Sequence, residues 1–343
     1  MANHRLEIGI GRQSQAPATR STAPAQATLA SRALKEPDDR KAMNLRFVEA
    51  FHWAVALKSV TRAAEKLHIT QSALSSRIAA LERELGVLLL DRRDKQFRLT
   101  VAGQRFHAFA QKLLEMQMHI KAEMGSGAVR ATVLRVGAIE SVVHSWLTGW
   151  LKHMQATHPD FELELTVETT PVLVDQLQRG KQDLVFAALP AAGDGVRTRA
   201  VPPMPMCFVG HRELHLKRRY RLPDLLSLDL LTFQRGSQPH VALLELFREA
   251  GSPPPRVHAI SSISAMAQLV EAGFGVATLP RAVVEPLARR LPLRVLPCDD
   301  TLEPLPIYAS YRDDPSSPLP EAALGSAVVH ASHRPGSSKK SMN

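Results

Sequence analysis

The sequence contains little cysteine and no long apolar run. Two cysteines, Cys207 and Cys298, stand far apart in 343 residues. They exclude a disulfide framework or a Cys-x-x-Cys metal site and favour a reducing compartment. No stretch of about eighteen apolar residues is present, so we expect no membrane-spanning helix. The N-terminal segment holds arginines but no apolar core before a cleavage site, unlike a secretory signal. These absences predict a cytoplasmic protein that does not bind membranes.

Sequence motifs of several enzyme and metal-binding classes are also absent. No phosphate loop with Gly-Lys-Ser/Thr occurs, and Gly273 and Gly275 alone do not make a dinucleotide fingerprint. His211 and His215 have a spacing that binds zinc on a helix, but they follow a predicted strand, and Glu213 is not at the position that the glutamate of a metalloprotease has. No nucleophile stands at a recognisable spacing from a base. We therefore expect no catalytic residues, no metal and no cofactor, in a protein that is not an enzyme.

Positive charge is concentrated in one part of the chain. The formal net charge is +10 and the isoelectric point is near 9.9, which indicates an acidic partner. Residues 43–105 contain eleven Lys and Arg against six Asp and Glu, a net charge of +5. Half of the excess thus lies in less than a fifth of the chain. This segment is the candidate for binding a polyanion.

Composition and apolar patterning divide the chain into five segments. Residues 1–42 are rich in Ala, Ser, Thr, Gln and Pro and are expected to form a disordered extension, with Met43 a candidate initiator. The predicted segments after it are a helical domain at 43–103, a linker helix and hinge at 104–129, an α/β domain at 130–312 and a disordered tail at 313–343.

The helical domain carries the pattern of three short helices. Apolar residues recur at helical spacing over 44–58, which predicts a first helix with one buried face. A second helix is expected over 59–67, with Ser59 or Thr61 as its N-cap. Thr70 is expected to cap a third helix over 71–85, which Gly86 ends. The expected buried stripe of the third helix is Leu74, Ile78, Leu81 and Leu85.

The other face of the third helix carries short polar side chains, which suit base edges and phosphates in a DNA major groove. The residues expected to contact DNA there are Thr70, Gln71, Ser72, Ser75, Ser76 and Arg77. Residues 87–100 then indicate a two-stranded wing that reaches the DNA backbone or minor groove. Its basic residues are Arg92, Arg93, Lys95 and Arg98. The pattern predicts a winged helix-turn-helix that binds double-stranded DNA. The alternatives are a winged helix kept only for protein contacts and a solvated charged face on an ordinary helical domain.

Several short motifs keep a fixed spacing between Phe47 and Arg105. They are Ala63-Ala64, Thr70-Gln71, Ala73-Leu74-Ser75, Leu81-Glu82, Leu85-Gly86, Leu90-Asp91-Arg92 and Leu99-Thr100-x-x-Gly103. The whole segment resembles the N-terminal domain of LysR-type transcriptional regulators. The resemblance implies that the recognition helix contacts DNA through Gln71, Ser72 and Ser75, with Arg92 in the wing. Ser76 departs from the family, which often has Arg there, so a base preference cannot be carried over.

A single helix is predicted over Gln104–Met124, ended by Gly125-Ser126-Gly127. Its apolar residues recur at spacings of three and four, which indicates a seam that pairs with another helix, although packing against its own domain is an alternative. These residues are Phe106, Phe109, Ala110, Leu113, Met116, Ile120 and Met124. Paired DNA half-sites need a two-fold protein, so we expect a homodimer. The family resemblance implies dimers through this helix and often homotetramers.

Strands and helices alternate from about residue 130 to 312. Strands are predicted over 134–137, 162–167, 183–186, 207–209 and 228–233, and helices over 146–157, 171–179, 240–250 and 263–272. The alternation predicts an α/β domain with largely parallel sheets. Its order fits a two-lobed module like the periplasmic binding proteins and resembles the effector-binding domain of the LysR family. We expect the chain to cross between the lobes near Ala200 and to return near Gly275.

A small molecule would bind in the cleft between these lobes. Ser141 lies between the first strand and a helix, a place that suits a carboxylate or another anion. The candidate effector-binding residues are Ser141, Val142, Thr169, Thr170, Phe233, Ser237 and Ser262. In the alternative interpretation Ser141 and Thr170 are only N-caps, and Ser237 only ends a strand. Arg235 is the one nearby cation, although an exposed loop arginine is more often solvated.

The sequence therefore favours a transcriptional regulator over two alternatives. Its expected partners are double-stranded DNA, a small-molecule co-inducer, further copies of the chain in a homodimer or homotetramer, and RNA polymerase. Ligand binding would shift the arrangement of a preformed oligomer on DNA. A solute-binding transport protein fits less well, because the chain has a basic winged helix and no secretion signal. An α/β enzyme fused to a DNA-binding domain fits less well, because no catalytic constellation is visible.

Overall fold

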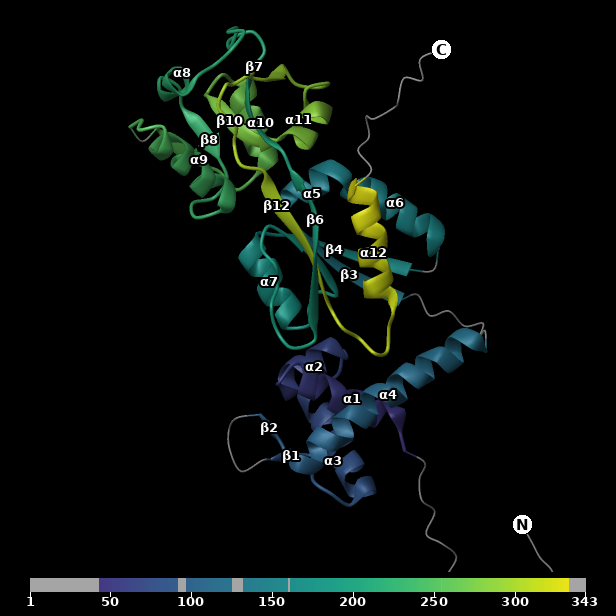
Figure 1. Ribbon diagram of the computed structural model, residues 1–343. Helices are drawn as coiled ribbons and strands as arrows, with labels where there is room; N and C mark the ends of the chain where they lie inside the picture. The colour runs from purple at the N-terminus through teal and green to yellow at the C-terminus, as the bar shows by residue number, and fades with distance from the viewer. Residues whose placement is uncertain (1–42, 92–96, 125–131, 160, 254, 333–343) are drawn as a thin grey trace, which may run out of the picture. The chain divides into compact units, whose positions relative to one another are not determined.

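The computed structural model describes residues 43–91, 97–124, 132–159, 161–253 and 255–332 (Figure 1). It consists of a helical domain and an α/β domain with two separate five-stranded sheets. No helix within these ranges is both long and apolar enough to cross a bilayer. The expected N-terminal extension at 1–42 and the hinge at Gly125-Ser126-Gly127 lie outside the described residues.

The helical domain is a winged helix-turn-helix, as the sequence predicts. Its elements are α1 (Leu45–Ala56), α2 (Val60–Lys66), α3 (Gln71–Leu85), β1 (Leu90–Asp91), β2 (Arg98–Leu99) and α4 (Val101–Glu123). Each helix starts at a polar N-cap whose side chain accepts a hydrogen bond from an amide of the first turn, which satisfies a donor that the helix leaves open. The four caps are Asn44, Ser59, Thr70 and Thr100. The fully buried residues Phe51, Trp53, Leu74, Ile78 and Leu81 form the centre of the core.

The connection from α3 to the wing is held by a buried carboxylate. Gly86 ends α3 in the left-handed conformation, with φ +70°, which glycine adopts without steric cost. Glu82 is only 5 % exposed, and its Oε1 accepts hydrogen bonds from the amides of Leu89 at 2.9 Å and Leu90 at 3.1 Å. Because Glu82 belongs to α3 and both amides lead into β1, these bonds fix the start of the wing relative to α3.

A second tight corner joins the wing to α4. The Thr100 hydroxyl accepts from the Gly103 amide at 2.9 Å and donates to the Leu88 carbonyl at 2.7 Å. A Cβ atom at Gly103 would lie 2.1 Å from the Leu89 carbonyl oxygen, so only glycine fits there. The motif Leu99-Thr100-x-x-Gly103 therefore makes this corner, and α4 begins at Val101 rather than at the predicted Gln104.

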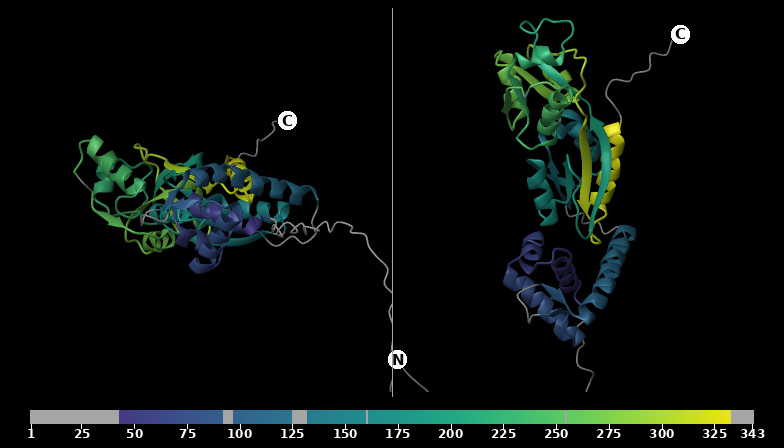
Figure 2. Two further views of the ribbon diagram at one scale, coloured as in Figure 1. Left: turned by 90° about the horizontal axis from the view of Figure 1, so that it is seen from below. Right: turned by 60° about the vertical axis from the view of Figure 1, so that its left-hand side comes forward.

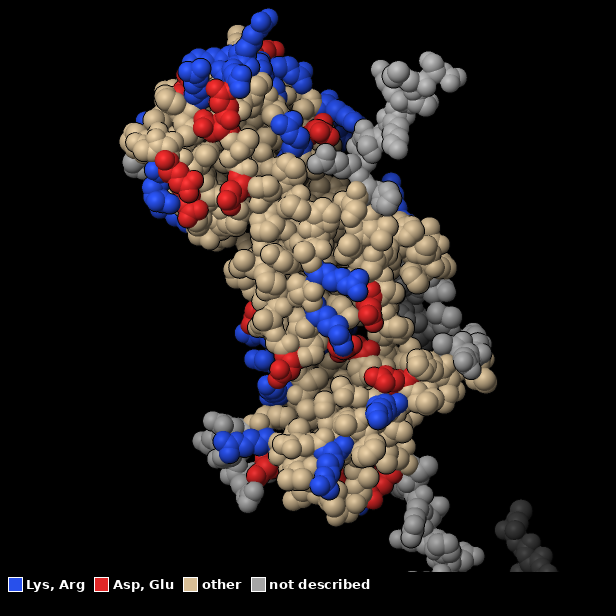
Figure 3. All heavy atoms as spheres, viewed as in Figure 1, with Lys and Arg blue, Asp and Glu red and all other residues tan. Residues whose placement is uncertain are grey.

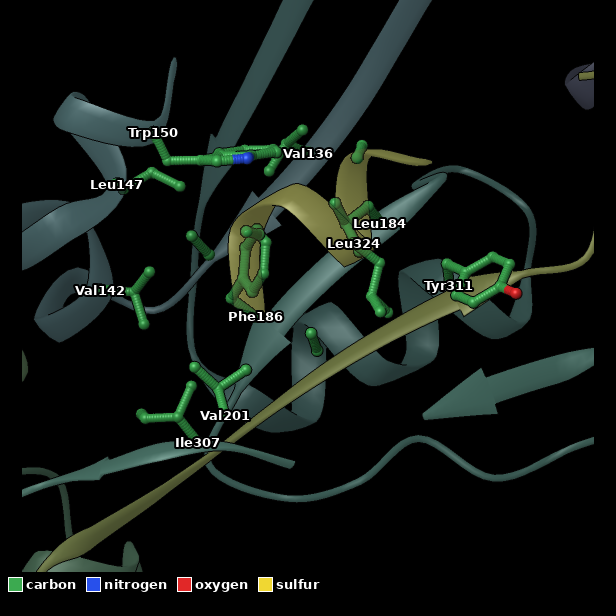
Figure 4. Packing of buried hydrophobic residues seen from close by; sticks show 14 of the residues in the cluster. Val136, Val142, Leu147, Trp150, Leu184, Phe186, Val201, Ile307, Tyr311 and Leu324 are labelled. Carbon is green, nitrogen blue, oxygen red and sulfur yellow. The ribbon is translucent and has the colours of Figure 1, made fainter. Parts of the chain in front are cut away.

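The first lobe of the α/β domain surrounds a five-stranded sheet in the order β4-β3-β5-β12-β6. Its elements are β3 (Thr132–Ala138), α5 (Glu140–Val142), the π-helical turn η1 (Val143–Leu147), α6 (Thr148–Thr157), β4 (Phe161–Val167), α7 (Thr170–Gln178), β5 (Leu184–Ala187), β6 (Val196–Met204), β12 (Leu305–Arg312) and α12 (Leu319–Ser332). Trp150 and Phe186 pack edge to face at the centre of its core, with ring centroids 5.5 Å apart (Figure 4).

The second lobe has its own sheet, in the order β11-β7-β10-β8-β9. Its elements are β7 (Met206–His211), α8 (Leu222–Leu226), β8 (Leu230–Thr232), α9 (Gln238–Glu249), β9 (Val257–Ala259), α10 (Ile263–Glu271), β10 (Val276–Pro280), α11 (Arg281–Leu287) and β11 (Leu293–Val295). The buried hydroxyls of Thr232 and Thr278 share a hydrogen bond inside the sheet, with their oxygens 2.7 Å apart. The predicted two-lobed architecture is confirmed.

The sheet directions and one crossing point differ from the prediction. Both sheets are mixed rather than largely parallel, because β12 runs antiparallel to β5 and β6, and β7 antiparallel to β10 and β11. The chain enters the second lobe at Pro205, between β6 and β7. The predicted return near Gly275 is wrong, since β10 and β11 follow it within the second sheet. The return lies between β11 and β12, at residues 296–304. The sequence prediction was wrong because the alternation of strands and helices carries no information about strand direction.

The predicted disordered tail at 313–343 is wrong for residues 319–332, which form α12. Ala323, Leu324 and Ala327 on this helix are buried in the core of the first lobe. Pro320 lies in the first turn of α12, where proline blocks no hydrogen bond and is well tolerated, so a proline-rich composition does not exclude a helix here. Residues 333–343 lie outside the described part of the chain.

Candidate functional site

The exposed face of α3 presents the polar side chains that the sequence predicts for DNA contact. Gln71, Ser72, Ser75 and Ser76 are exposed and Arg77 is half-buried, whereas the opposite stripe is buried against α1 and α2. Thr70 is occupied as a cap: its Oγ1 accepts from the Ala73 amide at 3.1 Å and lies 3.0 Å from the Ser72 hydroxyl. A rigid helix thus carries a row of small hydrogen-bonding groups, which is the arrangement a major groove accommodates.

The wing is described only in part. Arg98 lies on β2 with its side chain exposed, and it is paired with Asp91 in the register of the β1–β2 ladder. Arg92, Arg93 and Lys95, the other predicted wing contacts, lie outside the described residues. Their proposed role therefore rests on the sequence alone.

The α4 helix has two distinct apolar faces. Ala110 and Leu114 are buried in the core of the helical domain, so one face of α4 packs against its own domain. A second row points to solvent: Phe109 is 63 % exposed, Leu113 38 %, Met116 57 % and Ile120 55 %. Its spacing of four, three and four is that of a two-helix seam, and α4 extends beyond α1–α3 (Figures 1 and 2). The packing of α4 against its own domain is confirmed for the first face, and the pairing with another helix stays a prediction for the second.

A cavity of about 980 Å³ opens between the two lobes. The first lobe contributes the residues that follow β3 and β4, and the second lobe contributes the turn after β8 and the residues before α10. Of the seven predicted effector-binding residues, six line this cavity: Ser141, Thr169, Thr170, Phe233, Ser237 and Ser262. Val142 does not, because its side chain is fully buried in the core of the first lobe (Figure 4). Its placement in the cleft was wrong.

The hydroxyls of these residues are not all consumed by helix capping. Thr169 and Ser237 are the N-caps of α7 and α9, yet neither side chain makes a capping hydrogen bond. Ser141 lies inside α5 rather than before it, and Thr170 accepts a hydrogen bond from the Ala188 amide at 3.1 Å. The hydroxyls of Thr169, Ser237 and Ser141 are therefore available to a molecule in the cavity.

Glu140 is a cavity residue that the sequence interpretation missed. Its Oε2 accepts from the Ile263 amide at 2.7 Å and its Oε1 from the Ser262 hydroxyl at 3.2 Å, which joins the first lobe to the start of α10 in the second. His144 Nε2 lies 3.4 Å from Oε1. Burial alone raises the pKa of Glu140, but hydrogen bonds from His144, the Ile263 amide and Ser262 outweigh it and lower that pKa. The carboxylate is thus held ionised.

The remaining charged residues of the cavity are Glu168, Arg235, Glu245 and Glu303. Glu168 directly follows β4, so its place at a strand end is a signal that sequence reasoning can use. Glu303 lies in the irregular return segment, where no periodicity marks it.

The histidine pair considered for zinc has a local structural role. The ring of His215 accepts a hydrogen bond from the His211 amide at 3.0 Å through Nδ1, which closes the turn after β7. Within the described ranges no group of three or more His, Cys, Asp or Glu side chains is arranged to hold a metal ion.

Two family models together match almost all of the described chain. Residues 45–104 match the bacterial regulatory helix-turn-helix protein model of the lysR family, and residues 127–328 match the LysR substrate binding domain. The chain belongs to the LysR family. It is a transcriptional regulator with a DNA-binding helix-turn-helix domain and an effector-binding domain, the two domains that the family models match.

Individual relatives span both domains of this LysR-family chain. The HTH-type transcriptional regulator BenM of Acinetobacter baylyi is 25 % identical over 278 residues, 79 % of this chain and 90 % of BenM. A probable hydrogen peroxide-inducible genes activator of Streptomyces viridosporus is 32 % identical over 227 residues, 65 % of this chain and 73 % of its own length. The structure of a full-length OxyR variant from Pseudomonas aeruginosa has a TM-score of 0.56 at 24 % identity, covering 84 % of this chain and 95 % of OxyR.

Proposed function

We propose that this regulator reads DNA with the exposed face of α3 and the wing, and that a small molecule in the inter-lobe cavity alters that binding. The single observation that carries the proposal is the cavity itself, which is walled by both lobes. A ligand that touches both lobes has different contacts in each of their relative arrangements, so its binding shifts the population between them. The proposal assigns no catalytic reaction to the chain and places it in the cytoplasm, where its DNA is.

The DNA contacts are proposed by role. Gln71, Ser72 and Ser75 stand on the exposed side of the first turns of α3, where a recognition helix reaches base edges. Ser76 and Arg77 follow on the same helix, and Arg98 on β2 supplies a phosphate contact. The Thr70 hydroxyl is engaged in capping, so its contribution is to place the helix N-terminus against a phosphate.

The assembly is proposed to be a homodimer through the exposed row Phe109, Leu113, Met116 and Ile120 on α4, with a homotetramer as the larger form. An apolar row of this length is costly to leave in water and is the seam of a two-helix pairing. RNA polymerase is a further proposed partner, as expected for a regulator that acts at promoters.

A thiol-based peroxide sensor is the alternative that the Streptomyces relative's name raises, and the chemistry of the cysteines disfavours it. A sensing cysteine needs an accessible thiolate of low pKa. Cys207 is 6 % exposed and its Sγ donates to the Leu279 carbonyl, and burial raises the pKa of its thiol to about 11. Burial also raises the pKa of Cys298. We therefore propose a ligand-binding rather than a thiol-redox signal.

Genome-wide footprinting with the purified full chain tests the proposal. We expect protected sites upstream of genes, each with an interrupted two-fold symmetry that matches a two-fold protein. Protection spread without preference over random sequence would contradict it. The genes beside the protected sites would also indicate which metabolites to test in the cavity.

A further inference from the structure

The charge of the cavity is opposite to that of the chain. The whole protein has a formal net charge of +10, yet the charged residues lining the cavity are four carboxylates and one guanidinium: Glu140, Glu168, Glu245, Glu303 and Arg235. A surface that is basic overall attracts anions from a distance. Inside the cavity an anionic ligand is disfavoured, because the lining carries four carboxylates against one guanidinium and would repel it at close range.

One of the two helix N-termini of the second lobe that line the cavity is already filled by a protein carboxylate. A helix N-terminus with open amides is a natural anion site, and the cavity includes the start of α10. The carboxylate of Glu140 occupies it, 2.7 Å from the Ile263 amide, and the lowered pKa of Glu140 keeps the charge in place. An anionic ligand at this point would have to displace a protein carboxylate that is held by three hydrogen-bonding groups, Ser262 and His144 among them.

The other three carboxylates form no ion pair within the described part of the chain, and Arg235 is the one cation that lines the same cavity. Glu168, Glu245 and Glu303 are exposed along the cavity, and no ion pair or hydrogen bond engages them within the described part of the chain. They come from three different elements: the end of β4, the helix α9 and the return segment. Acidic side chains gather over α9 in Figure 3. Three such carboxylates around one cavity favour a positively charged occupant.

The cavity also holds polar groups that lack a protein partner. Ser141 is only 2 % exposed and lines the cavity, yet its hydroxyl bonds to nothing within the described ranges. Ser237 Oγ and Gln238 Oε1, at the start of α9, are buried and equally unpartnered. Buried polar atoms are normally paired, so these three point to a ligand with hydrogen-bonding groups. Two of them are hydroxyls and the third is a carbonyl acceptor, which all pair with N–H donors.

We propose that the ligand of this cavity is an organic amine, which bears at least one ammonium or guanidinium group and at most one carboxylate. Its cationic group faces Glu168, Glu245 and Glu303, and its N–H donors reach Ser141, Ser237 and Gln238. Arg235 is the single cation in the lining, so it can pair with the one carboxylate of an amino acid but not with those of a dicarboxylate. This assignment rests on the proposed effector role of the cavity and replaces the anion that the sequence suggested beside Ser141.

Thermal unfolding of the full chain with matched five-carbon probes tests this assignment. The probes are 1,5-diaminopentane, lysine, 1,5-pentanediol and glutarate, each at the same ionic strength and in large excess. We expect the diamine or lysine to raise the midpoint temperature by about 3 °C, because a ligand bound only to the folded state stabilises it. We expect the diol and glutarate to leave it unchanged. A larger rise with glutarate than with either amine would overturn the assignment.

A charge-removing variant shows whether the effect comes from this cavity. In the triple variant Glu168→Gln, Glu245→Gln, Glu303→Gln the amine affinity should fall at least tenfold, whereas Glu249→Gln, on α9 but outside the lining, should leave it unchanged. Circular dichroism and DNA binding in the absence of ligand should be unaltered in both. Undiminished amine binding in the triple variant would overturn the assignment. Stabilisation by none of the probes would count against the effector role as well, whereas stabilisation by the anion alone would leave that role standing.

Discussion

The pKa of His52, in the core of the helical domain, is strongly lowered by burial. Its side chain is 2 % exposed, neither ring nitrogen has a hydrogen-bond partner within the described residues, and it stacks on His107 with ring centroids 5.4 Å apart. Burial, reinforced by His107, lowers the pKa of His52 from 6.5 to about 4. The ring is therefore neutral in the folded protein at any pH above this range.

The free energy of unfolding should depend on this histidine between pH 6.5 and 4. In that range the unfolded chain binds a proton that the folded chain excludes, so stability falls as the pH is lowered. A difference of two to three pKa units corresponds to a loss of roughly 3 kcal/mol. Denaturant unfolding at a series of pH values should show this loss, and His52→Leu should flatten it. The same slope in both proteins would contradict the assignment.

Gly103 gives a stability prediction at a single backbone position. A Cβ at this residue would lie 2.1 Å from the Leu89 carbonyl oxygen, and backbone cannot move aside as a side chain can. Gly103→Ala should therefore lower the free energy of unfolding by about 3 kcal/mol. Gly325→Ala is the matched control: it lies within α12, nothing stands within 4 Å of its added methyl, and helix propensity favours alanine by about 0.5–1 kcal/mol. Equal effects at both sites would contradict the account.

At the scale of the elements, α3 and the wing should divide their tasks. Gln71→Ala or Ser75→Ala should weaken binding to a specific DNA fragment about tenfold, and binding to random duplex much less, because these side chains face base edges. Arg98→Ala should weaken both alike and reduce the salt dependence by about one phosphate contact. Fluorescence anisotropy on the two duplexes at several salt concentrations separates the cases. Parallel losses in all three variants would refute the division.

The exposed row on α4 predicts the oligomeric state. Met116→Lys together with Ile120→Lys would place two charges in the seam, and the dimer should dissociate to monomers in sedimentation velocity. Gln111→Lys together with Gln117→Lys adds the same two charges at positions of α4 outside the row and should leave the dimer intact. A double variant that sediments as the wild type would show that the chains associate elsewhere.

Elements that depend on neighbouring residues follow from the sequence. The N-cap Thr70, the stop at Gly86 and three of the four expected buried residues of α3 come from local rules and are confirmed. The fourth, Leu85, is only partly buried, and Glu82 is buried in that turn. The misplaced features depend on distant partners. Helix α12 is stabilised by the core of the first lobe rather than by its own composition. The return of the chain to that lobe is set by how β12 pairs with β5 and β6.

The cavity shows the same division at the scale of the whole molecule. Six of seven expected residues line it, because strand ends and helix starts cluster at one edge of each sheet. Val142 was misplaced since the turn of α5 sends its side chain into the core. Glu140 and Glu303 were missed because only the closure of two lobes, joined by segments far apart in sequence, brings their carboxylates into the same cavity.

Sequence-specific DNA binding by the intact chain is the central claim for the whole molecule. The most direct measurement is the affinity of the purified protein for a footprinted upstream fragment and for a scrambled duplex of equal length, across a range of salt concentrations. The account predicts that the specific fragment binds at least about 1,000-fold more tightly, while both affinities fall steeply with salt. Equal affinity for the two duplexes at every salt concentration would contradict it.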